Sequence, residues 1–195
     1  MLDVKFYSQA NQDRFVYEIL IKSNPNPVLN GTFLDIGCND PVEISNTYAL
    51  EQLGWTGCLL DIHEGMIDKC KAKRTSLCLV ADATKFDWNT LPYTHFNYLS
   101  IDVDQHTEPT IDSLLNSKLS FDIATIEHDC YFFGTTYRDR LREKLTRAGY
   151  HLYVGDVCNN DGFYNSFEDW WVSEKYKNIN FDQSFINTIH KRQCR

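Results

Sequence analysis

This 195-residue sequence lacks a long apolar run and any CxxC pair of cysteines, and it has no excess of positive charge. No apolar run approaches the roughly 18 residues that a membrane-spanning helix needs. The first residues also lack the basic start and apolar core of a signal peptide. We therefore expect a soluble, cytoplasmic protein that does not bind membranes.

Negative charge dominates, because 27 Asp and Glu residues stand against 19 Lys and Arg, for a formal net charge of -8. Tight, nonspecific nucleic-acid binding relies on a positive surface, so no nucleic-acid partner is expected. The most basic stretch, Arg138 to Arg147, has helical spacing and is interpreted as a solvated helix face.

The seven cysteines are scattered and odd in number. Both facts disfavour a disulfide framework and a zinc knuckle. We interpret them as small buried thiols in a reducing compartment.

Strand patterns alternate with helix patterns along most of the chain. Predicted strands cover residues 32–36, 55–62, 76–80, 96–102, 121–127 and 150–154, and predicted helices cover residues 8–21, 45–51, 65–73, 110–115 and 137–147. Such alternation indicates an α/β protein with a doubly wound parallel sheet. No repeat or linker is evident, so we expect one domain over residues 1–195, with an N-terminal helical segment (1–30), a cofactor-binding core (31–160) and a closing segment (161–195).

The closing segment has two notable stretches. Trp170 and Trp171 either pack over the sheet edge or stack on a sugar or base, and packing is the favoured interpretation. Residues 180–189 are strand-like.

Acidic residues mark the ends of the predicted strands. They are Asp35, Asp61, Asp102, Glu127 and Asp156, with Asp82 in the turn after the third strand. Each of them alone could serve as a helix N-cap. Parallel sheets bind ligands outside the carboxyl ends of their strands, so together these acids indicate a site for hydroxyls and cationic groups.

The loop after the first predicted strand favours one cofactor over another. A dinucleotide would need a G-x-G-x-x-G loop for its pyrophosphate, but this loop has Gly37 alone, and Asp40 would repel phosphate. S-adenosyl-L-methionine has no phosphate and carries a sulfonium, an ammonium and a ribose diol. We therefore expect Asp61 to accept the ribose hydroxyls and Asp82 the adenine amino group. Asp35 and Asn39 would face the methionine end, where Gly37 permits close backbone approach.

Several motifs resemble the FkbM-type branch of the class I methyltransferases. They are Tyr7-Ser8-Gln9 with Gln12-Asp13, Phe33 to Asp40 followed by Ser45-Asn46-Thr47, Leu99 to Asp104 with Glu108, Ile126-Glu127-His128, and later Tyr137-Arg138, Gly155 to Cys158 and Phe167 to Trp171. The resemblance spans residues 7 to about 170. It implies the Rossmann-like seven-stranded class I methyltransferase fold, a mostly parallel sheet flanked by helices with an antiparallel last strand. It also implies methyl transfer from S-adenosylmethionine, usually to a hydroxyl of a sugar or small-molecule natural product.

Within this resemblance, Asn46 and Asp102 join the predicted cofactor site. The acceptor is expected to be a small molecule or glycan. Gln105-His106 stands where members of the family commonly have glycine and a small residue, and the extra segments that often build an acceptor pocket are missing.

Methyl transfer to an alcohol needs a base beside the methyl group. His128 is the first choice because an imidazole titrates near neutral pH, and Asp102 and Glu127 are the other candidates. A His128 that only bonds a neighbouring carboxylate is the alternative. A divalent metal is not expected, but Asp102, Asp104, Glu127 and His128, with Asp156, could form a ligand set for one. The acceptor side would then be lined by Asn46, Tyr131, Tyr137 and Arg138.

Two other functions stay open. A non-catalytic binding module with this fold would suit the small size of the chain. A nicotinamide-dependent oxidoreductase would suit the strand order, but not the single-glycine loop.

Overall fold

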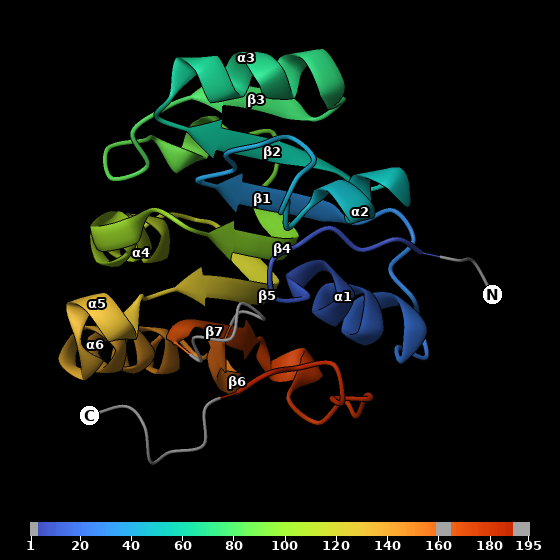
Figure 1. Ribbon diagram of the computed structural model, residues 1–195, viewed down its shortest axis with the longest axis vertical. Coiled ribbons are helices and arrows are strands. Elements are labelled where there is room, and N and C mark those ends of the chain that lie inside the picture. The colour runs from blue at the N-terminus through green and yellow to red at the C-terminus, as the bar shows by residue number, and fades with distance from the viewer. Residues whose placement is uncertain (1–3, 159–164, 189–195) are drawn as a thin grey trace.

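The computed structural model describes residues 4–158 and 165–188. A seven-stranded sheet in the order β3-β2-β1-β4-β5-β7-β6 runs through it (Figure 1). The strands are β1 (Thr32–Ile36), β2 (Thr56–Asp61), β3 (Leu77–Val80), β4 (His95–Ile101), β5 (Ser120–Glu127), β6 (His151–Cys158) and β7 (Ser166–Val172). The strands from β1 to β5 pair in parallel, whereas β7 is antiparallel to both β5 and β6. This confirms the mostly parallel sheet with an antiparallel last strand.

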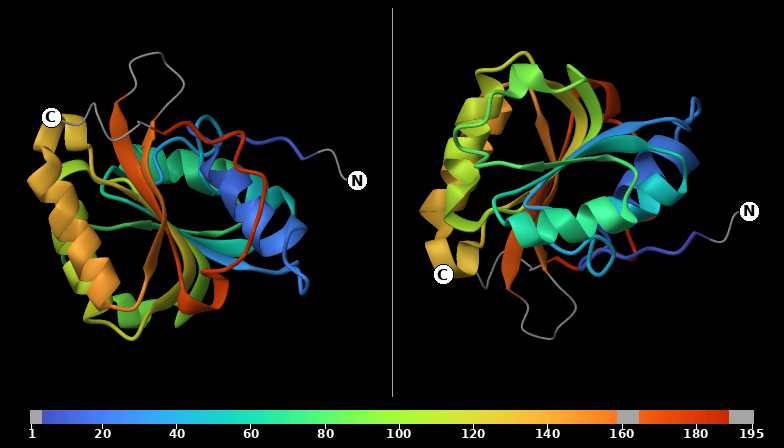
Figure 2. Two further views of the ribbon diagram at one scale, coloured as in Figure 1. Left: turned by 90° about the horizontal axis from the view of Figure 1, so that it is seen from below. Right: turned by 90° about the horizontal axis from the view of Figure 1, so that it is seen from above.

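Helices cover both faces of the sheet. In Figure 2, α1 and α3 lie on one face, while α4, α5 and α6 lie on the other. The helical elements are α1 (Gln12–Tyr17), which continues into a π-helical turn η1 (Glu18–Lys22), then α2 (Tyr48–Gln52), α3 (Glu64–Lys73), α4 (Thr107–Leu115), α5 (Cys130–Phe133) and α6 (Thr135–Arg147). Short 3-10 turns are η2 (Trp88–Thr90), η3 (Asp104–His106) and η4 (Glu174–Tyr176). None of the helices in these ranges combines the length and the apolar character that crossing a bilayer would need.

The core has two halves because successive strand residues point to opposite faces of the sheet. Trp170 packs with Phe15 and Ile19 on the α1 side, and Trp171 packs with Leu141 and other residues on the α6 side. Both tryptophans are buried. This confirms the packing interpretation, although β7 lies between β5 and β6 and not at the sheet edge.

The chain ends differ from the sequence-based expectation. Residues 180–188 form no strand beyond an isolated bridge between Val157 and Thr188, so the strand-like interpretation of this stretch is wrong, and residue 189 lies outside the described residues. The antiparallel neighbour of β5 is β7, whose sequence is continuously buried and shows no alternation. The first helix starts at Gln12 and not at Ser8, because Ser8 bridges to Ile44 and its hydroxyl bonds Asp13.

The basic face of α6 is only partly solvated. Arg147 is exposed, but Arg142 reaches inward and its guanidinium binds both oxygens of buried Asp169, at 2.7 Å each. Arg140 pairs with Glu108, and Lys144 pairs with Asp112 on α4. The stretch is therefore largely neutralised by acids of the neighbouring elements.

Candidate functional site

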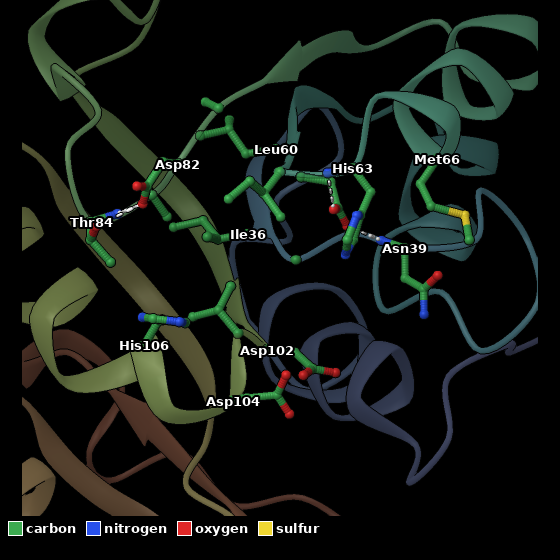
Figure 3. A pocket seen from close by; sticks show the side chains of 16 residues that line it. Ile36, Asn39, Leu60, His63, Met66, Asp82, Thr84, Asp102, Asp104 and His106 are labelled. Carbon is green, nitrogen blue, oxygen red and sulfur yellow. Dashed lines mark hydrogen bonds between the residues drawn. The ribbon is translucent and has the colours of Figure 1, made fainter.

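A cavity of about 660 Å³ lies at the carboxyl ends of β1, β2 and β4. Its size is within the range of small-molecule and cofactor sites. Figure 3 shows Asp82, Asp102, Asp104 and apolar Leu60 around it. A second cavity, of about 30 Å³, adjoins the first, since both are lined by Gly37, Asn39 and Asp102. Four of the predicted strand-end acids, Asp35, Asp61, Asp82 and Asp102, line these two cavities, whereas Glu127 and Asp156 line neither of them.

Gly37 brings the loop after β1 against the end of β4. Its φ of +80° lies in the left-handed region, and a Cβ at this position would sit 1.7 Å from the backbone oxygen of Asp102. The Gly37 amide donates to the carbonyl of Leu60 at 2.8 Å. Only glycine fits this contact, and the loop backbone is thereby exposed to the cavity.

Asp61, the last residue of β2, organises the cavity from beneath. Its Oδ2 accepts the amide of Asn39 at 3.1 Å, and its Oδ1 accepts the amide of His63 at 2.8 Å. The carboxylate is buried but lines the cavity. Each oxygen retains a lone pair for a further donor, as a ribose diol would require.

Asp35 lies lower, against the small cavity. Its Oδ2 accepts the Thr47 hydroxyl at 2.7 Å. Burial raises the pKa of Asp35 to about 6, against the opposing effects of Thr47 and of the charge on Arg74. Asp35 therefore lines the small cavity and also holds the neighbouring segment in place through Thr47.

Asn46 offers an unused acceptor. Its Nδ2 donates to Ser100 Oγ on β4 at 3.0 Å, which orients the amide, while its Oδ1 is buried and has no hydrogen-bond partner among the described residues. Asn46 lines the small cavity together with Asp35 and Asp102. An orphaned acceptor beside carboxylates suits an ammonium group.

Asp82, in the turn after β3, is already partly engaged. Hydrogen bonds from Lys85 and Thr84 lower its pKa to about 2. It lines the large cavity as an anion, on the side opposite the small cavity, where a purine amino group could still bond it.

A dense group of carboxyls closes the other side of the site. Asp104, Glu127 and Asp129 each offer an oxygen, and these oxygens lie within 4.8 Å of one another. Asp104 and Asp129 both have left-handed backbone conformations, which Asp tolerates better than most residues. Burial and the contact with Asp102 raise the pKa of Glu127. Carboxylate oxygens of this kind are donors that a divalent metal accepts.

His128 lies elsewhere. It is 2% exposed, its Nδ1 accepts the amide of Cys130, and its Nε2 lies 3.5 Å from Asp169. Asp156 lies in the same cluster, where Arg138 binds it at 2.7 Å. His128 lines neither cavity, so the structure does not join it to Asp102 and Asp104 in one ligand set. This placement favours the alternative of a histidine beside a carboxylate.

The expected acceptor-side residues Tyr137 and Arg138 are occupied as well. The Tyr137 hydroxyl accepts the amide of Glu108, and Arg138 binds Asp156 and Asp139. Tyr131, by contrast, is 57% exposed on α5.

Several residues of the site carried no sequence signal. His63 and Met66 line the large cavity. Buried Arg74 donates to the Pro41 carbonyl at 3.1 Å and to Thr47 Oγ1 at 3.1 Å, which holds the segment that carries Asn46. The partners of Arg74 lie 23 or more residues away in the sequence, so no local pattern could reveal its role.

The sheet order and the position of the acid-lined cavity define the fold as that of the class I methyltransferases. The acceptors that line the two cavities suit S-adenosylmethionine, because Asp61 could accept its ribose hydroxyls and Asn46 Oδ1, which has no partner among the described residues, could accept its ammonium.

Three solved structures illustrate the likeness. The chain is similar to a TehB-like SAM-dependent methyltransferase from Corynebacterium glutamicum (TM-score 0.56, 13% identity, 87% of this chain and 89% of that chain covered). It is also similar to magnesium protoporphyrin IX methyltransferase from Synechocystis with bound SAM (0.56, 17%, 84% and 78%). A third is an rRNA methylase from Streptococcus thermophilus (0.55, 11%, 83% and 93%). No family model and no curated protein matches the sequence.

Proposed function

We propose that this protein is an S-adenosylmethionine-dependent methyltransferase of the FkbM type that acts in the cytoplasm. The observation that carries the proposal is the 660 Å³ cavity at the strand ends, with Gly37 backbone on one side and buried Asp61 beneath. Asp61 would hold the ribose, Asp82 the adenine, and Asn46 and Asn39 the methionine end, with Asp35 behind them. The bound cofactor supplies an electrophilic methyl group on a sulfonium.

The acceptor is proposed to be a hydroxyl of a glycan or small-molecule natural product. Tyr131 and Phe132 are exposed on α5, 57% and 77% respectively, and aromatic side chains of this kind stack on sugar rings. Most of the basic side chains of α6 are paired with acids, so few of them could bind the phosphates of RNA. These features support a small acceptor over RNA.

Asp102 is the proposed base. It lines both cavities, whereas Glu127 contacts it from β5. A carboxyl pair of this kind would let Asp102 take the acceptor proton while Glu127, through its own proton, keeps Asp102 oriented. His128 would act by holding the turn that carries Asp129.

Titration calorimetry with S-adenosylhomocysteine tests the proposal. We expect saturable binding by the wild-type protein. Asp61→Asn should weaken this binding by about tenfold or more, because it replaces a carboxylate oxygen that would accept a ribose hydroxyl and that accepts the Asn39 amide. Asp112→Asn, on α4 outside both cavities, is the matched control and should bind normally. Absence of binding to the wild-type protein would overturn the proposal, and saturable binding of NAD instead would support the oxidoreductase.

Binding alone does not separate an enzyme from a binding module. Incubation with methyl-labelled S-adenosylmethionine and a panel of glycan and small-molecule acceptors does. A labelled product whose formation Asp102→Asn reduces much more than it reduces the binding of S-adenosylhomocysteine supports the enzyme. Cofactor binding without any product across the panel favours the binding module.

A further inference from the structure

Two cysteine sulfurs meet directly beneath the cofactor loop. Cys38 lies between Gly37 and Asn39, and Cys70 lies on α3; their Sγ atoms are 3.9 Å apart. Both are free thiols and both are buried. The S–S bond of a disulfide is about 2.05 Å long, so the two sulfurs have to move about 2 Å closer to form one.

The two thiols form a chemical unit. They share a hydrogen bond, and Cys70 Sγ also reaches the carbonyl of Asn39 at 3.6 Å. The hydrogen bond between the two thiols raises the pKa of Cys38 and lowers the pKa of Cys70. The positive charge of Arg74 also lowers the pKa of Cys70 and so favours its thiolate form. The shared hydrogen bond gives the Cys38 proton a path to the Cys70 sulfur, which the proton takes as the Cys38 sulfur loses electron density on forming its bond to oxygen.

Cys38 is the more accessible residue of the pair, because it is 6% exposed whereas Cys70 is 0% exposed. Cys38 lines the small cavity, whose volume of about 30 Å³ admits a molecule not much larger than water. Cys58, on the neighbouring strand β2, is buried and lines neither cavity. A small oxidant such as hydrogen peroxide thus meets Cys38 first.

We propose that Cys38 and Cys70 are a reversible disulfide site that hydrogen peroxide closes and that a thiol reductant opens. Cys38 sulfur attacks one peroxide oxygen, the O–O bond breaks, and the Cys38 proton passes to the Cys70 thiolate. The hydroxide released takes a proton from solvent, and Cys38 is left as a sulfenic acid. The Cys70 thiol then attacks the Cys38 sulfur, so that the S–S bond forms, the S–O bond breaks, and a second water leaves with the Cys70 proton.

The disulfide would act on the cofactor site through the loop. Gly37 and Cys38 amides both bond the Leu60 carbonyl, and the Asn39 amide bonds Asp61. Drawing Cys38 toward α3 displaces these neighbours, which line the cavity. Because binding sites tolerate errors of only about 0.5 Å, the affinity for S-adenosylhomocysteine should fall by about tenfold or more. This last step rests on the proposed function, whereas formation of the disulfide does not.

The site itself is tested by mass spectrometry of the full chain after hydrogen peroxide. We expect loss of two hydrogens, reversal by dithiothreitol, and one cross-linked peptide pair. Trypsin with Glu-C separates Cys38 from Cys58, since Glu43 and Glu51 lie between them. The expected pair joins residues 23–43 to residues 70–71. Cys70→Ser should abolish this cross-link, and Cys78→Ser, the matched control on β3, should retain it.

A cross-link between other cysteines, or overoxidation of Cys38 without a disulfide, would overturn the proposal. Calorimetry is then run on the reduced and the oxidised chain. Binding by the reduced chain that weakens on oxidation and returns with dithiothreitol supports the switch, and equal affinity in both forms overturns the regulatory part. No binding by the reduced chain refutes the proposed function instead, while the peptide map still decides the disulfide.

Discussion

The carboxyl groups of Asp102 and Glu127 contact each other at the ends of the adjacent parallel strands β4 and β5. Ile101 and Ile126 are register partners, so the residues that follow them, Asp102 and Glu127, lie side by side. Two buried neighbouring carboxyls repel each other when both are ionised, so one of them keeps its proton. Burial and this contact raise the pKa of Glu127, which identifies it as the protonated member.

We expect the Glu127 carboxyl to stay protonated through neutral pH. In carbon-detected NMR of the protein labelled at Glu carboxyls, with Glu127→Gln for assignment, its signal should not titrate between about pH 5 and pH 8. In Asp102→Asn the neighbouring charge is gone, and the Glu127 titration should move to lower pH. A wild-type signal that titrates near the ordinary Glu value would contradict the shared proton.

Gly37→Ala should destabilise the fold and empty the site. The new Cβ would meet the Asp102 carbonyl at 1.7 Å, on a backbone with φ +80°. We expect a loss of about 3 kcal/mol in the free energy of unfolding, measured by urea denaturation. Gly65→Ala on α3, where a Cβ meets nothing within 4 Å, should gain up to about 1 kcal/mol. Equal changes in the free energy of unfolding for the two variants would contradict the close contact between Gly37 and the Asp102 carbonyl.

Stability should depend on the protonation of Glu168. Burial raises its pKa to about 8 from 4.5. The protonated form is therefore favoured by folding, and its contribution is fully present below pH 4.5 and is lost as the pH rises through about 8. Between these values, wild-type protein should lose up to about 1.4 kcal/mol per pH unit relative to Glu168→Gln. Urea denaturation at a series of pH values measures this difference, and a constant difference would count against a protonated Glu168.

Arg74 should be among the costliest side chains to remove. It is fully buried, it pairs with Glu51, and it supports the Pro41 to Thr47 segment. Arg74→Met leaves Glu51 without its cation, so we expect a loss of about 3–5 kcal/mol in the free energy of unfolding. Arg147→Met, which breaks an exposed pair with Glu143, should cost less than about 0.5 kcal/mol. Comparable losses would show that the burial of Arg74 contributes little.

Much of the sheet could be predicted because its signals are local. Each strand from β1 to β5 is a short apolar run that ends in a polar residue or turn, and the predicted bounds of these five strands match the structure within one residue. The sixth predicted strand, 150–154, stops four residues before the end of β6. β7 was not recognised as a strand, and residues 180–189 were mistaken for one. Strand propensity depends on which neighbours cover a segment, and the position of β7 between β5 and β6 buries every one of its residues.

The site divides in the same way. The acids Asp35, Asp61, Asp82 and Asp102 were predictable because parallel strands bring their carboxyl ends to one edge. The position of His128 was not, since the burial of a side chain just after a strand depends on what packs over the strand end. Here the backbone of Phe167 and the carboxylate of Asp169, both from β7, enclose it.

By itself, the sequence determined the alternation of strands and helices, the single glycine of the cofactor loop and the acids at the strand ends. Each of these is set by residues within a few positions of one another. Only the tertiary structure decided that Asp102 meets Glu127, that Arg74 supports Thr47, and that Cys38 meets Cys70. Those contacts join elements 25 to 32 residues apart, and the packing of helices on a twisted sheet selects them.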